Sequence, residues 1–137
     1  MYVKDVMNTD PYLLYEEDTI LSASKFMKQE RIRNLPVVDK EKKLVGLITL
    51  REIISTFSTN PDKISVRDAM IKLITSVNPD ISLQSAIEIM ILNKYGCLPV
   101  VDENKKLIGM LTEADLLKTL YHISTLPSEL LKTKSNK

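Results

Sequence analysis

One long internal repeat constrains what this chain can fold into. When the sequence is shifted by 63 residues, residues 3–55 align with residues 66–118 without a gap, and 16 of the 53 aligned positions are identical. The segment "NLPVVDKEKKLVGLIT" of the first copy matches "CLPVVDENKKLIGMLT" of the second. Self-similarity at a fixed period is typical of a repeated supersecondary unit. We therefore interpret the two segments as two copies of one structural unit.

The domain boundaries follow from the two copies and from the segments outside them. We expect a first unit over residues 1–58 and a second unit over residues 66–124. Residues 59–65 are predicted to form a surface linker, because a Pro-Asp pair and polar residues disfavour regular structure there. Residues 125–137 are expected to form a solvated tail, since Pro127 interrupts the last helical pattern and the chain ends in "KTKSNK".

The second copy shows the order of its elements most clearly. A β-branched run at residues 74–77 predicts a strand, and Ser82 is a favourable N-cap for the helix that follows. "CLPVVD" and residues 107–111 are predicted to form two strands joined by a polar hairpin turn, and a second helix is predicted from Thr112. Apolar residues recur at helical spacing in the two helices, at Leu83, Ala86, Ile87, Met90 and Ile91 and at Leu116, Leu117, Leu120 and Ile123.

The first copy repeats this order. Its first helix is predicted from about Thr19 to Glu30, and its last helix has apolar residues at Ile53, Ile54 and Phe57. Each unit thus has the order β-α-β-β-α and roughly 55 residues, which is marginal for a lone domain. A three-stranded sheet with helices on one face leaves its other face uncovered, so we expect the two units to bury those faces against each other. The expected fold is a single pseudo-symmetric α+β (α/β) body.

Composition excludes several classes of protein. The net charge of +1 lacks the basic excess typical of a nucleic-acid-binding protein. No apolar run approaches the roughly 18 residues that a membrane-spanning helix needs, and the charged N-terminus is unlike a signal peptide. The single cysteine, Cys97, excludes an intrachain disulfide and agrees with a reducing compartment, so we expect a cytoplasmic protein. Cys97 and the single His122 cannot form a His/Cys zinc site within one chain.

The motifs, taken together, match a known family. An apolar helix followed by "LPVVD", a short polar turn and "LxGxxT-x-x-D/E" closely resembles the cystathionine-β-synthase-type (CBS) domain, and two such domains in tandem resemble the Bateman module. The resemblance covers about residues 1–120, and it is specific because each copy has "LPVVD" at the same distance from the Gly-x-x-Thr strand. It implies two β-α-β-β-α units packed sheet to sheet around a pseudo-two-fold axis.

The resemblance also implies a function. Modules of this kind commonly form homodimers and commonly bind AMP, ADP, ATP or S-adenosylmethionine in two clefts between the units. They usually regulate an enzyme, channel or transporter and are not catalysts themselves. We therefore expect a regulatory adenosyl ligand and no catalytic cofactor. The regulated partner is expected to be a separate protein, because this sequence shows no attached effector domain.

The Thr-x-x-acid pattern near the end of each copy has two interpretations. Thr49 with Glu52 fits a capping box at a helix start. In the pair Thr112 and Asp115 the shorter acid is expected to be a poorer partner for the helix and to suit a ligand better. In the family that the sequence resembles, the Thr bonds phosphate or ribose and the acid accepts from the ribose hydroxyls. If only one cleft binds tightly, we expect it to be the cleft that uses Thr112 and Asp115.

Further candidate ligand contacts come from the resemblance alone. In the family the backbone just before the Pro of "LPVVD" faces the adenine ring, and the segment after each "D-x-M" also lines a cleft. The matching residues are Ile32, Arg33, Asn34 and Pro36 for one cleft, Tyr95, Gly96, Cys97 and Pro99 for the other, and Thr9, Asp10 and Thr75 after the "D-x-M" segments. Each cleft also takes residues from the opposite unit, which leaves the assignment to one cleft open. Arg33 is the basic residue best placed to hold phosphates, and Tyr95 either stacks on adenine or fills a core edge.

Other functions are weighed against this one. The main alternative is a ligand-free dimerisation or interaction module, because Glu52 departs from the family's Asp or Asn and the sequence shows no obvious phosphate-gripping pair of arginines. An enzyme would need a nucleophile–base pair or a metal cluster, and nothing in the sequence places Cys97 near His122. Cys97 is instead expected to be a small buried residue. Nucleic-acid binding is disfavoured because the sequence has no Trp and only two Phe residues to stack on bases.

Overall fold

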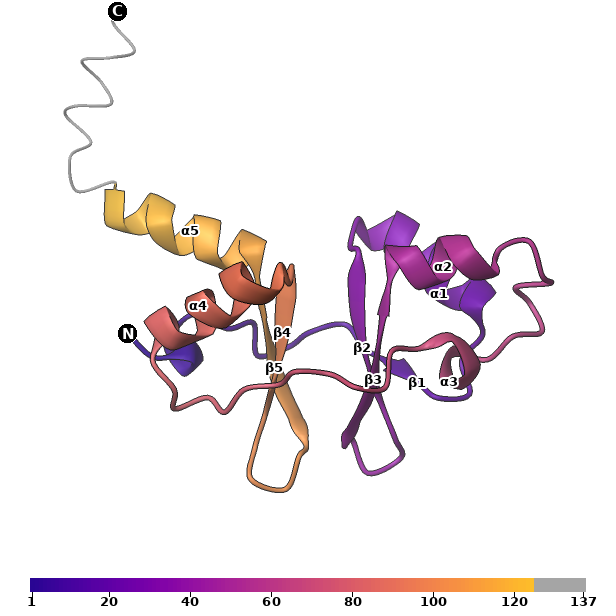
Figure 1. Ribbon diagram of the computed structural model, residues 1–137, viewed down its shortest axis with the longest axis horizontal. Helices are drawn as coiled ribbons and strands as arrows, with labels where there is room; N and C mark the ends of the chain where they lie inside the picture. Colours follow the sequence, from indigo (N-terminus) through magenta and orange to yellow (C-terminus); the bar gives the residue numbers. More distant parts are fainter. Residues whose placement is uncertain (125–137) are drawn as a thin grey trace, which may run out of the picture.

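The computed structural model describes residues 1–124, which form two β-sheets side by side, each with helices on its outer face (Figure 1). The first unit contains β1 (Leu14–Tyr15), α1 (Ile20–Glu30), β2 (Asn34–Val38), β3 (Leu44–Thr49) and α2 (Leu50–Thr56). The second contains α4 (Leu83–Asn93), β4 (Cys97–Val101), β5 (Leu107–Thr112) and α5 (Glu113–Ser124). Two single turns, η1 (Val3–Asp5) and α3 (Val66–Ala69), precede them. Within residues 1–124 no helix is long and apolar enough to cross a membrane. The tail predicted at residues 125–137 lies outside the described residues.

The strand order confirms the predicted hairpins and corrects one strand. β2 pairs with β3 and β4 with β5, both antiparallel, and β1 adds to β2 in parallel. The strand predicted at residues 74–77 is wrong, because only Val77 pairs, as a single parallel bridge to Val100. Its N–H donates to the Pro99 carbonyl at 3.0 Å, and its carbonyl accepts from the Val101 N–H at 3.0 Å. The residues just before Val77 run along the cleft described below instead of along β4.

Capping fixes both ends of the first helix in each unit. The side chains of Thr19 and Ser82 accept hydrogen bonds from backbone N–H groups three residues on, at 3.1 and 3.0 Å. These starts of α1 and α4 confirm the predictions. Each helix ends at a residue in the left-handed region, Arg31 with φ 55° and Lys94 with φ 57°. A left-handed residue at a helix end turns the chain sharply. The turn directs the residues that follow toward the start of β2 or β4.

Each unit has its own apolar core, between its sheet and its helices. The first core includes Ile20, Leu35 and Ile48, and the second includes Leu98 and Leu111, all fully buried. The helix faces predicted from the spacing of apolar residues are confirmed only in part. Several of these positions are exposed, namely Ile54, Phe57, Ile91, Leu117, Leu120 and Ile123. Apolar spacing marks one face of a helix but does not say what covers it. In Figure 1, α5 extends outward beyond its sheet, so most of its apolar face meets no part of its own unit.

The inner faces of the two sheets are buried against each other, as predicted. Successive side chains of a strand point to opposite faces. Leu35 and Val37 belong to the first core, so Pro36 and Val38 point away from it, yet both are fully buried. Pro99 is likewise fully buried, on the face of β4 opposite the second core. The two units therefore form the expected pseudo-symmetric body, sheet to sheet (Figure 1).

The segment that begins each repeat packs on the other unit. Val3 lies in the second core, and Asn8 pairs with Met110 of β5. In the same way Val66 lies in the first core, and Ile71 pairs with Leu47 of β3. Each unit is thus completed by a segment from the other copy. This exchange holds Ile71 at β3 of the first unit's hairpin. The residues after Ile71 then run back to the second unit, where Val77 pairs with Val100.

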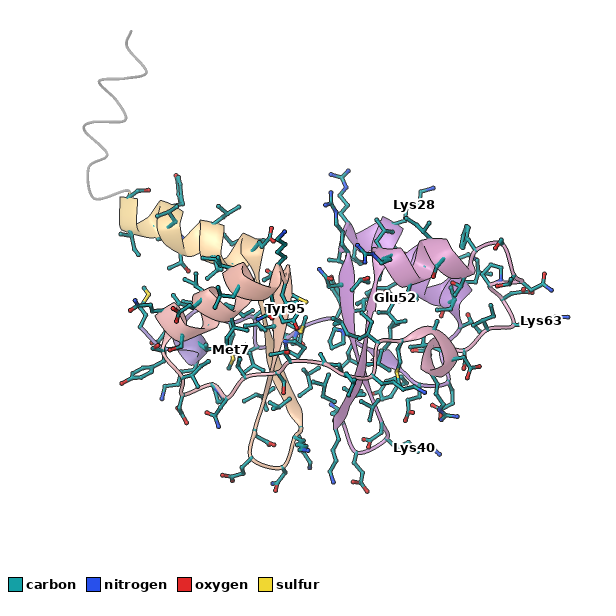
Figure 2. The ribbon with its side chains drawn as sticks, viewed as in Figure 1. Met7, Lys28, Lys40, Glu52, Lys63 and Tyr95 are labelled. Atoms are coloured by element: carbon teal, nitrogen blue, oxygen red, sulfur yellow. The ribbon has the colours of Figure 1, made fainter. Side chains whose placement is uncertain are left out.

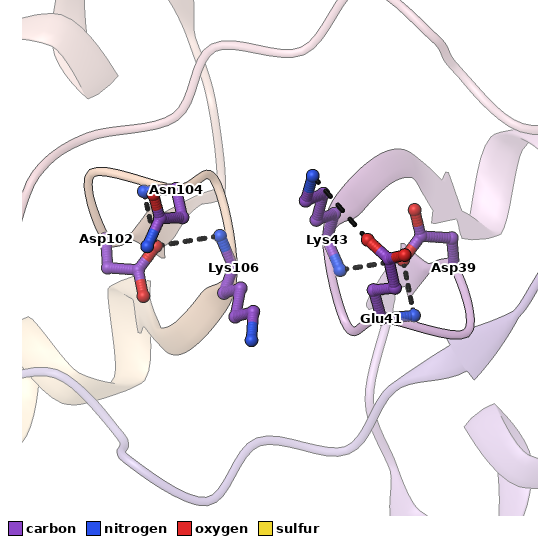
Figure 3. A network of polar contacts seen from close by, with 6 residues as sticks. All are labelled: Asp39, Glu41, Lys43, Asp102, Asn104 and Lys106. Atoms are coloured by element: carbon purple, nitrogen blue, oxygen red, sulfur yellow. Dashed lines mark hydrogen bonds and ion pairs between the residues drawn. The ribbon is translucent and has the colours of Figure 1, made fainter.

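The two hairpin turns have the same internal hydrogen bonds (Figure 3). The Asp39 carboxylate accepts from the backbone N–H groups of Glu41 and Lys43, at 2.8 and 3.0 Å. Asp102 accepts equivalently from Asn104 and Lys106 at the same distances. The turns also meet across the units, since the Leu44 N–H donates to the Lys105 carbonyl and the Leu107 N–H to the Lys42 carbonyl, both at 3.0 Å. These cross-links hold the two sheets in one fixed register at this end.

Candidate functional site

A cleft of about 610 Å³ lies between the two units, and we call it the first cleft. This volume is within the range usual for small-molecule sites. Its lining comes from the starts of β2 and β4, the β3–α2 junction and the segment after α3. The lining residues are Arg33, Asn34, Leu47, Thr49, Leu50, Arg51, Glu52, Ile71, Leu73, Ile74, Thr75, Asn93, Lys94, Tyr95, Gly96, Cys97 and Pro99.

Two side chains of the second copy are linked by a hydrogen bond at this cleft. The Thr75 and Tyr95 hydroxyl oxygens lie 3.3 Å apart. Tyr95 follows the left-handed end of α4, and Thr75 belongs to the segment that runs from Ile71 on the first unit back to Val77 on the second. Figure 2 shows Tyr95 on the second unit and Glu52 on the first, on the sides of the two units that face each other. The cleft thus presents an aromatic ring from one unit opposite a carboxylate from the other.

The Thr49 and Glu52 pair forms a capping box at the start of α2. One oxygen of Glu52, Oε1, accepts from the Thr49 N–H at 2.7 Å and also from the Thr49 hydroxyl. No residue among 1–124 donates to the other oxygen, Oε2, within hydrogen-bond distance. A carboxylate oxygen has room for further donors. The carboxylate can therefore cap the helix and still accept from a ligand hydroxyl.

The second pair forms the same arrangement, which corrects the prediction that Asp is too short for it. Asp115 Oδ2 accepts from both the N–H and the hydroxyl of Thr112, each at 2.9 Å. The Asp115 N–H in turn lies 3.3 Å from Thr112 Oγ1. The shorter side chain still reaches, because Thr112 presents both donors toward the first turn of α5. Neither residue lines the first cleft.

Positive charge predominates at the first cleft. Of the described residues, the cations Arg33, Arg51 and Lys94 line it, and Glu52 is the only carboxylate that does. Among residues 1–124, none of the three cations takes part in an ion pair. An anionic group could therefore bind without displacing an internal partner. The first cleft thus contains a pair of arginines, Arg33 and Arg51, that was not obvious from the sequence.

Backbone hydrogen bonds fix the strand starts that flank the cleft. The Leu50 N–H donates to the Arg33 carbonyl at 3.0 Å, and the Glu113 N–H donates to the Gly96 carbonyl at 3.2 Å. The start of each hairpin is thereby tied to the helix that ends the same unit. A side chain added at Gly96 would approach Asn34 Nδ2 no closer than 3.7 Å. It would lie at the same distance from Glu113 Oε1, so a methyl group at Gly96 would make ordinary van der Waals contacts without a clash.

Cys97 is not placed to act as a nucleophile. Its side chain is buried, and burial raises the pKa of the thiol from 9.0 to about 11, with a smaller contribution from the negative charge of Glu113. The thiolate is the reactive form of cysteine. The protonated thiol of Cys97 is thus part of the apolar floor of the first cleft. Among the described residues, no group of three His, Cys, Asp or Glu side chains could hold a metal ion.

The structure gathers most, but not all, of the residues predicted from the sequence. Nine of them line the first cleft together: Arg33, Asn34, Thr49, Glu52, Thr75, Tyr95, Gly96, Cys97 and Pro99. The resemblance placed the residues before the two "LPVVD" strands in separate clefts, whereas the structure brings them to one, because β2 and β4 start side by side across the pseudo-two-fold axis. Pro36 is buried between the sheets, and Ile32 lines a smaller neighbouring cleft. Thr9 and Asp10 are exposed and, like Thr112 and Asp115, line neither cleft.

Eight residues that line the first cleft were not among the sequence-based candidates: Leu47, Leu50, Arg51, Ile71, Leu73, Ile74, Asn93 and Lys94. Arg51 follows Thr49 by two positions, so its place in the first turn of α2 was a signal that could have revealed it. Asn93 is the last residue of α4. Leu73 is 97% exposed at the cleft, and no pattern in the sequence distinguished it from a core residue.

The fold and the cleft define a class of protein: a tandem pair of α/β units, β-α-β-β-α and α-β-β-α, with a cleft of small-molecule size between them. The chain belongs to the CBS domain family, whose family model matches residues 3–59 and 66–122. The resemblance stated from the sequence is thereby confirmed.

Three known proteins illustrate how far the similarity extends. The chain is 38% identical over 117 residues to inosine-5′-monophosphate dehydrogenase of Methanocaldococcus jannaschii, a match that covers 85% of this chain but 22% of that protein. The crystal structure of AcuB from Vibrio cholerae superposes with a TM-score of 0.86 at 29% identity, covering 94% of this chain and 96% of the other. The CBS domain pair of protein MJ0100, solved with 5′-methylthioadenosine and S-adenosyl-L-methionine, has a TM-score of 0.77 at 25% identity and covers 88% and 99% of the two chains.

Proposed function

We propose that this protein is a regulatory module that binds an adenosyl ligand, such as AMP, ADP, ATP or S-adenosylmethionine, in the first cleft. One observation carries the proposal: the same cleft is lined by an aromatic ring, by a carboxylate oxygen without a donor among residues 1–124, and by three cations without an ion-pair partner among those residues. Tyr95 would stack on the adenine, Glu52 Oε2 would accept from the ribose hydroxyls, and Arg33 and Arg51 would hold a phosphate. The ligands of the MJ0100 domain pair support the ligand class.

Binding at this position would act on the angle between the units. The lining comes from both copies, so a ligand that contacts Tyr95 and Glu52 together favours the arrangement in which the two lie opposite each other. A ligand shifts such an equilibrium only by the difference in its affinity for the two arrangements. The regulated partner is proposed to be a separate protein in the cytoplasm.

A homodimer is part of the proposal, and the repeat supports it. Ile54 and Phe57 of α2 correspond under the 63-residue shift to Leu117 and Leu120 of α5. All four are more than half exposed. Equivalent apolar positions on pseudo-symmetric helices form a surface that a second copy can match in a two-fold arrangement.

Calorimetry with the four adenosyl compounds tests the binding proposal. The protein should bind at least one of them, and Glu52→Gln should weaken binding, because the amide oxygen can still cap α2 while the negative charge is lost. Glu41→Gln, an exposed turn residue outside the cleft, is the matched control and should leave affinity unchanged. No heat and no rise in melting temperature with any of the four compounds, together with a persistent dimer, would support the ligand-free interaction module instead.

A further inference from the structure

A second, smaller cleft adjoins the first one on the first unit. It has a volume of about 340 Å³ and lies between α1, the α1–β2 connection and α2. Its lining residues are Ser24, Met27, Lys28, Arg31, Ile32, Arg33, Leu50 and Ile53. Arg33 and Leu50 line both clefts. The two clefts therefore adjoin at Arg33 and Leu50, whose backbones are hydrogen-bonded to each other.

The second cleft combines an apolar floor with a cationic rim. Met27 and Ile53 are 4% exposed and form part of its floor. Lys28, Arg31 and Arg33 are exposed on its rim, and no carboxylate of the described part of the chain lines it. In Figure 2, Lys28 is labelled on the same unit as Glu52, above the helices. Within residues 1–124 none of these three cations forms an ion pair, so their charges are available to a ligand.

Two of the three cations of the rim, Lys28 and Arg33, belong to one copy of the repeat only. The residues equivalent to Lys28, Arg31 and Arg33 in the second copy are Ile91, Lys94 and Gly96. A rim required by the fold would occur in both copies, because both have the same helix and turn. The charges of Lys28 and Arg33 therefore point to a ligand on the first unit, whereas a cation at the position of Arg31 is common to both copies.

We infer that the second cleft holds the distal phosphates of a nucleotide whose adenosine occupies the first cleft, which makes a nucleoside triphosphate the preferred ligand. The inference rests on the proposed function and names its ligand class. The first phosphate would lie near Arg33 and Arg51, and the following phosphates would lie between Lys28 and Arg31. The apolar floor strengthens these attractions, since charges interact more strongly where water is displaced by a medium of low dielectric constant.

Affinities for AMP, ADP and ATP, measured by calorimetry on the full chain, test the inference. We expect ATP to bind about tenfold or more tightly than AMP, with ADP between them. The double variant Lys28→Gln with Arg31→Gln should abolish most of this preference and leave AMP affinity unchanged. Lys25→Gln is the matched control, because Lys25 is exposed on the same helix but lines neither cleft. The preference should also decrease with added salt.

The outcomes separate this inference from the proposed function. If AMP binds but the double variant keeps the wild-type preference for ATP, the inference is overturned and the proposed function stands. Inorganic tripolyphosphate provides an independent probe: binding that is lost in the double variant, with no adenosyl compound bound, would support the anion site and overturn the proposed function. Binding of neither would overturn both. A change in oligomeric state caused by the double variant would show that a second copy occupies the cleft, and would also overturn the inference.

Discussion

The hydroxyl of Tyr95 lies 3.3 Å from the hydroxyl of Thr75, at the cleft where the two copies meet. The contact links the start of β4 to the segment that crosses from α3 to the second unit. That segment is tied to β3 by the paired backbone hydrogen bonds of Ile71 and Leu47, at 2.9 and 3.0 Å. The ring of Tyr95 is therefore oriented by a segment whose beginning is held by the first unit. A change in the angle between the units would move the ring relative to Glu52.

Removal of the Tyr95 ring should weaken adenosyl binding more than removal of its hydroxyl. Stacking between a base and an aromatic side chain is worth about 1–3 kcal/mol by alanine substitution, so Tyr95→Ala should lower affinity roughly 5- to 150-fold. Tyr95→Phe keeps the ring and loses the bond to Thr75, so a smaller, severalfold loss is expected. Thr75→Val should match Tyr95→Phe, and calorimetry measures the affinities of all three variants.

Tyr12→Phe serves as the control, since the Tyr12 hydroxyl donates to Glu30 outside both clefts. Equal affinity of Tyr95→Ala and the wild type would contradict a stacking role.

The two capping carboxylates give a test of which side binds more tightly. The sequence favours Thr112 and Asp115, whereas the first cleft is lined by Thr49 and Glu52. Glu52→Gln and Asp115→Asn are matched changes, because each keeps an acceptor for its Thr and loses one charge. A charged hydrogen bond contributes about 1.5–3 kcal/mol. Whichever of the two carboxylates contacts the ligand, its variant should therefore lose at least tenfold in affinity. Calorimetry of the two variants side by side decides between the two sides, and equal small losses would contradict a ligand role for either acid.

Local sequence patterns determine the hairpins and caps but not the arrangement of the cleft. "LPVVD" and Gly-x-x-Thr encode strands and a turn whose hydrogen bonds lie within a few residues, and these predictions are confirmed. The first cleft instead depends on a long-range exchange, in which the segment from Val66 to Ile71 packs on the first unit and the chain then returns to the second unit at Val77. No periodicity in a single sequence shows which unit such a segment joins. For the same reason the spacing of Ile54 and Leu117 predicted a buried helix face where the described chain provides no cover.

The three glycines should differ in their tolerance of a methyl group. At Gly109 an added Cβ would lie 2.9 Å from the Asn8 carbonyl oxygen, and Asn8 is held by two backbone hydrogen bonds to Met110. At Gly46 it would meet only the flexible Met70 side chain, and at Gly96 it would come no closer than 3.7 Å to any neighbour. Overpacking costs about 1–3 kcal/mol, so Gly109→Ala should destabilise most, Gly46→Ala less, and Gly96→Ala by almost nothing. Urea unfolding measures this order, and a destabilised Gly96→Ala would show that Asn34 or Glu113 lies closer to Gly96 than 3.7 Å.

The proposed dimer predicts which exposed apolar residues matter for association. Leu117→Glu and Ile54→Glu place a charge at equivalent positions of α5 and α2, where burial against a second copy would be unfavourable. Each should shift the protein from dimer to monomer in sedimentation velocity. Ile91→Lys is the control: Ile91 is exposed, and Lys is the residue at the equivalent position of the first copy. If Leu117→Glu stays dimeric, a different surface forms the dimer.

The buried thiol of Cys97 should react slowly and should make stability depend on alkaline pH. With a pKa of about 11, only about one molecule in a thousand carries a thiolate at pH 8, so alkylation should be about 100-fold slower than in the unfolded chain. A raised pKa means that the folded state holds the proton more tightly. The stability that this contributes is complete below pH 9 and is lost as the pH rises toward 11. The free energy of unfolding of the wild type should therefore fall more steeply over this range than that of Cys97→Ala.

Glu113→Gln separates the two causes of the raised pKa. Burial is the larger cause, so removing the Glu113 charge should accelerate alkylation of Cys97 only modestly. Bound ligand should slow alkylation further, because Cys97 lines the first cleft. Protection by ATP in the wild type, and its loss in Tyr95→Ala, would place the nucleotide over this thiol by a readout independent of calorimetry. Alkylation as fast as in the unfolded chain would instead mean that the two units separate readily and expose Cys97 between them.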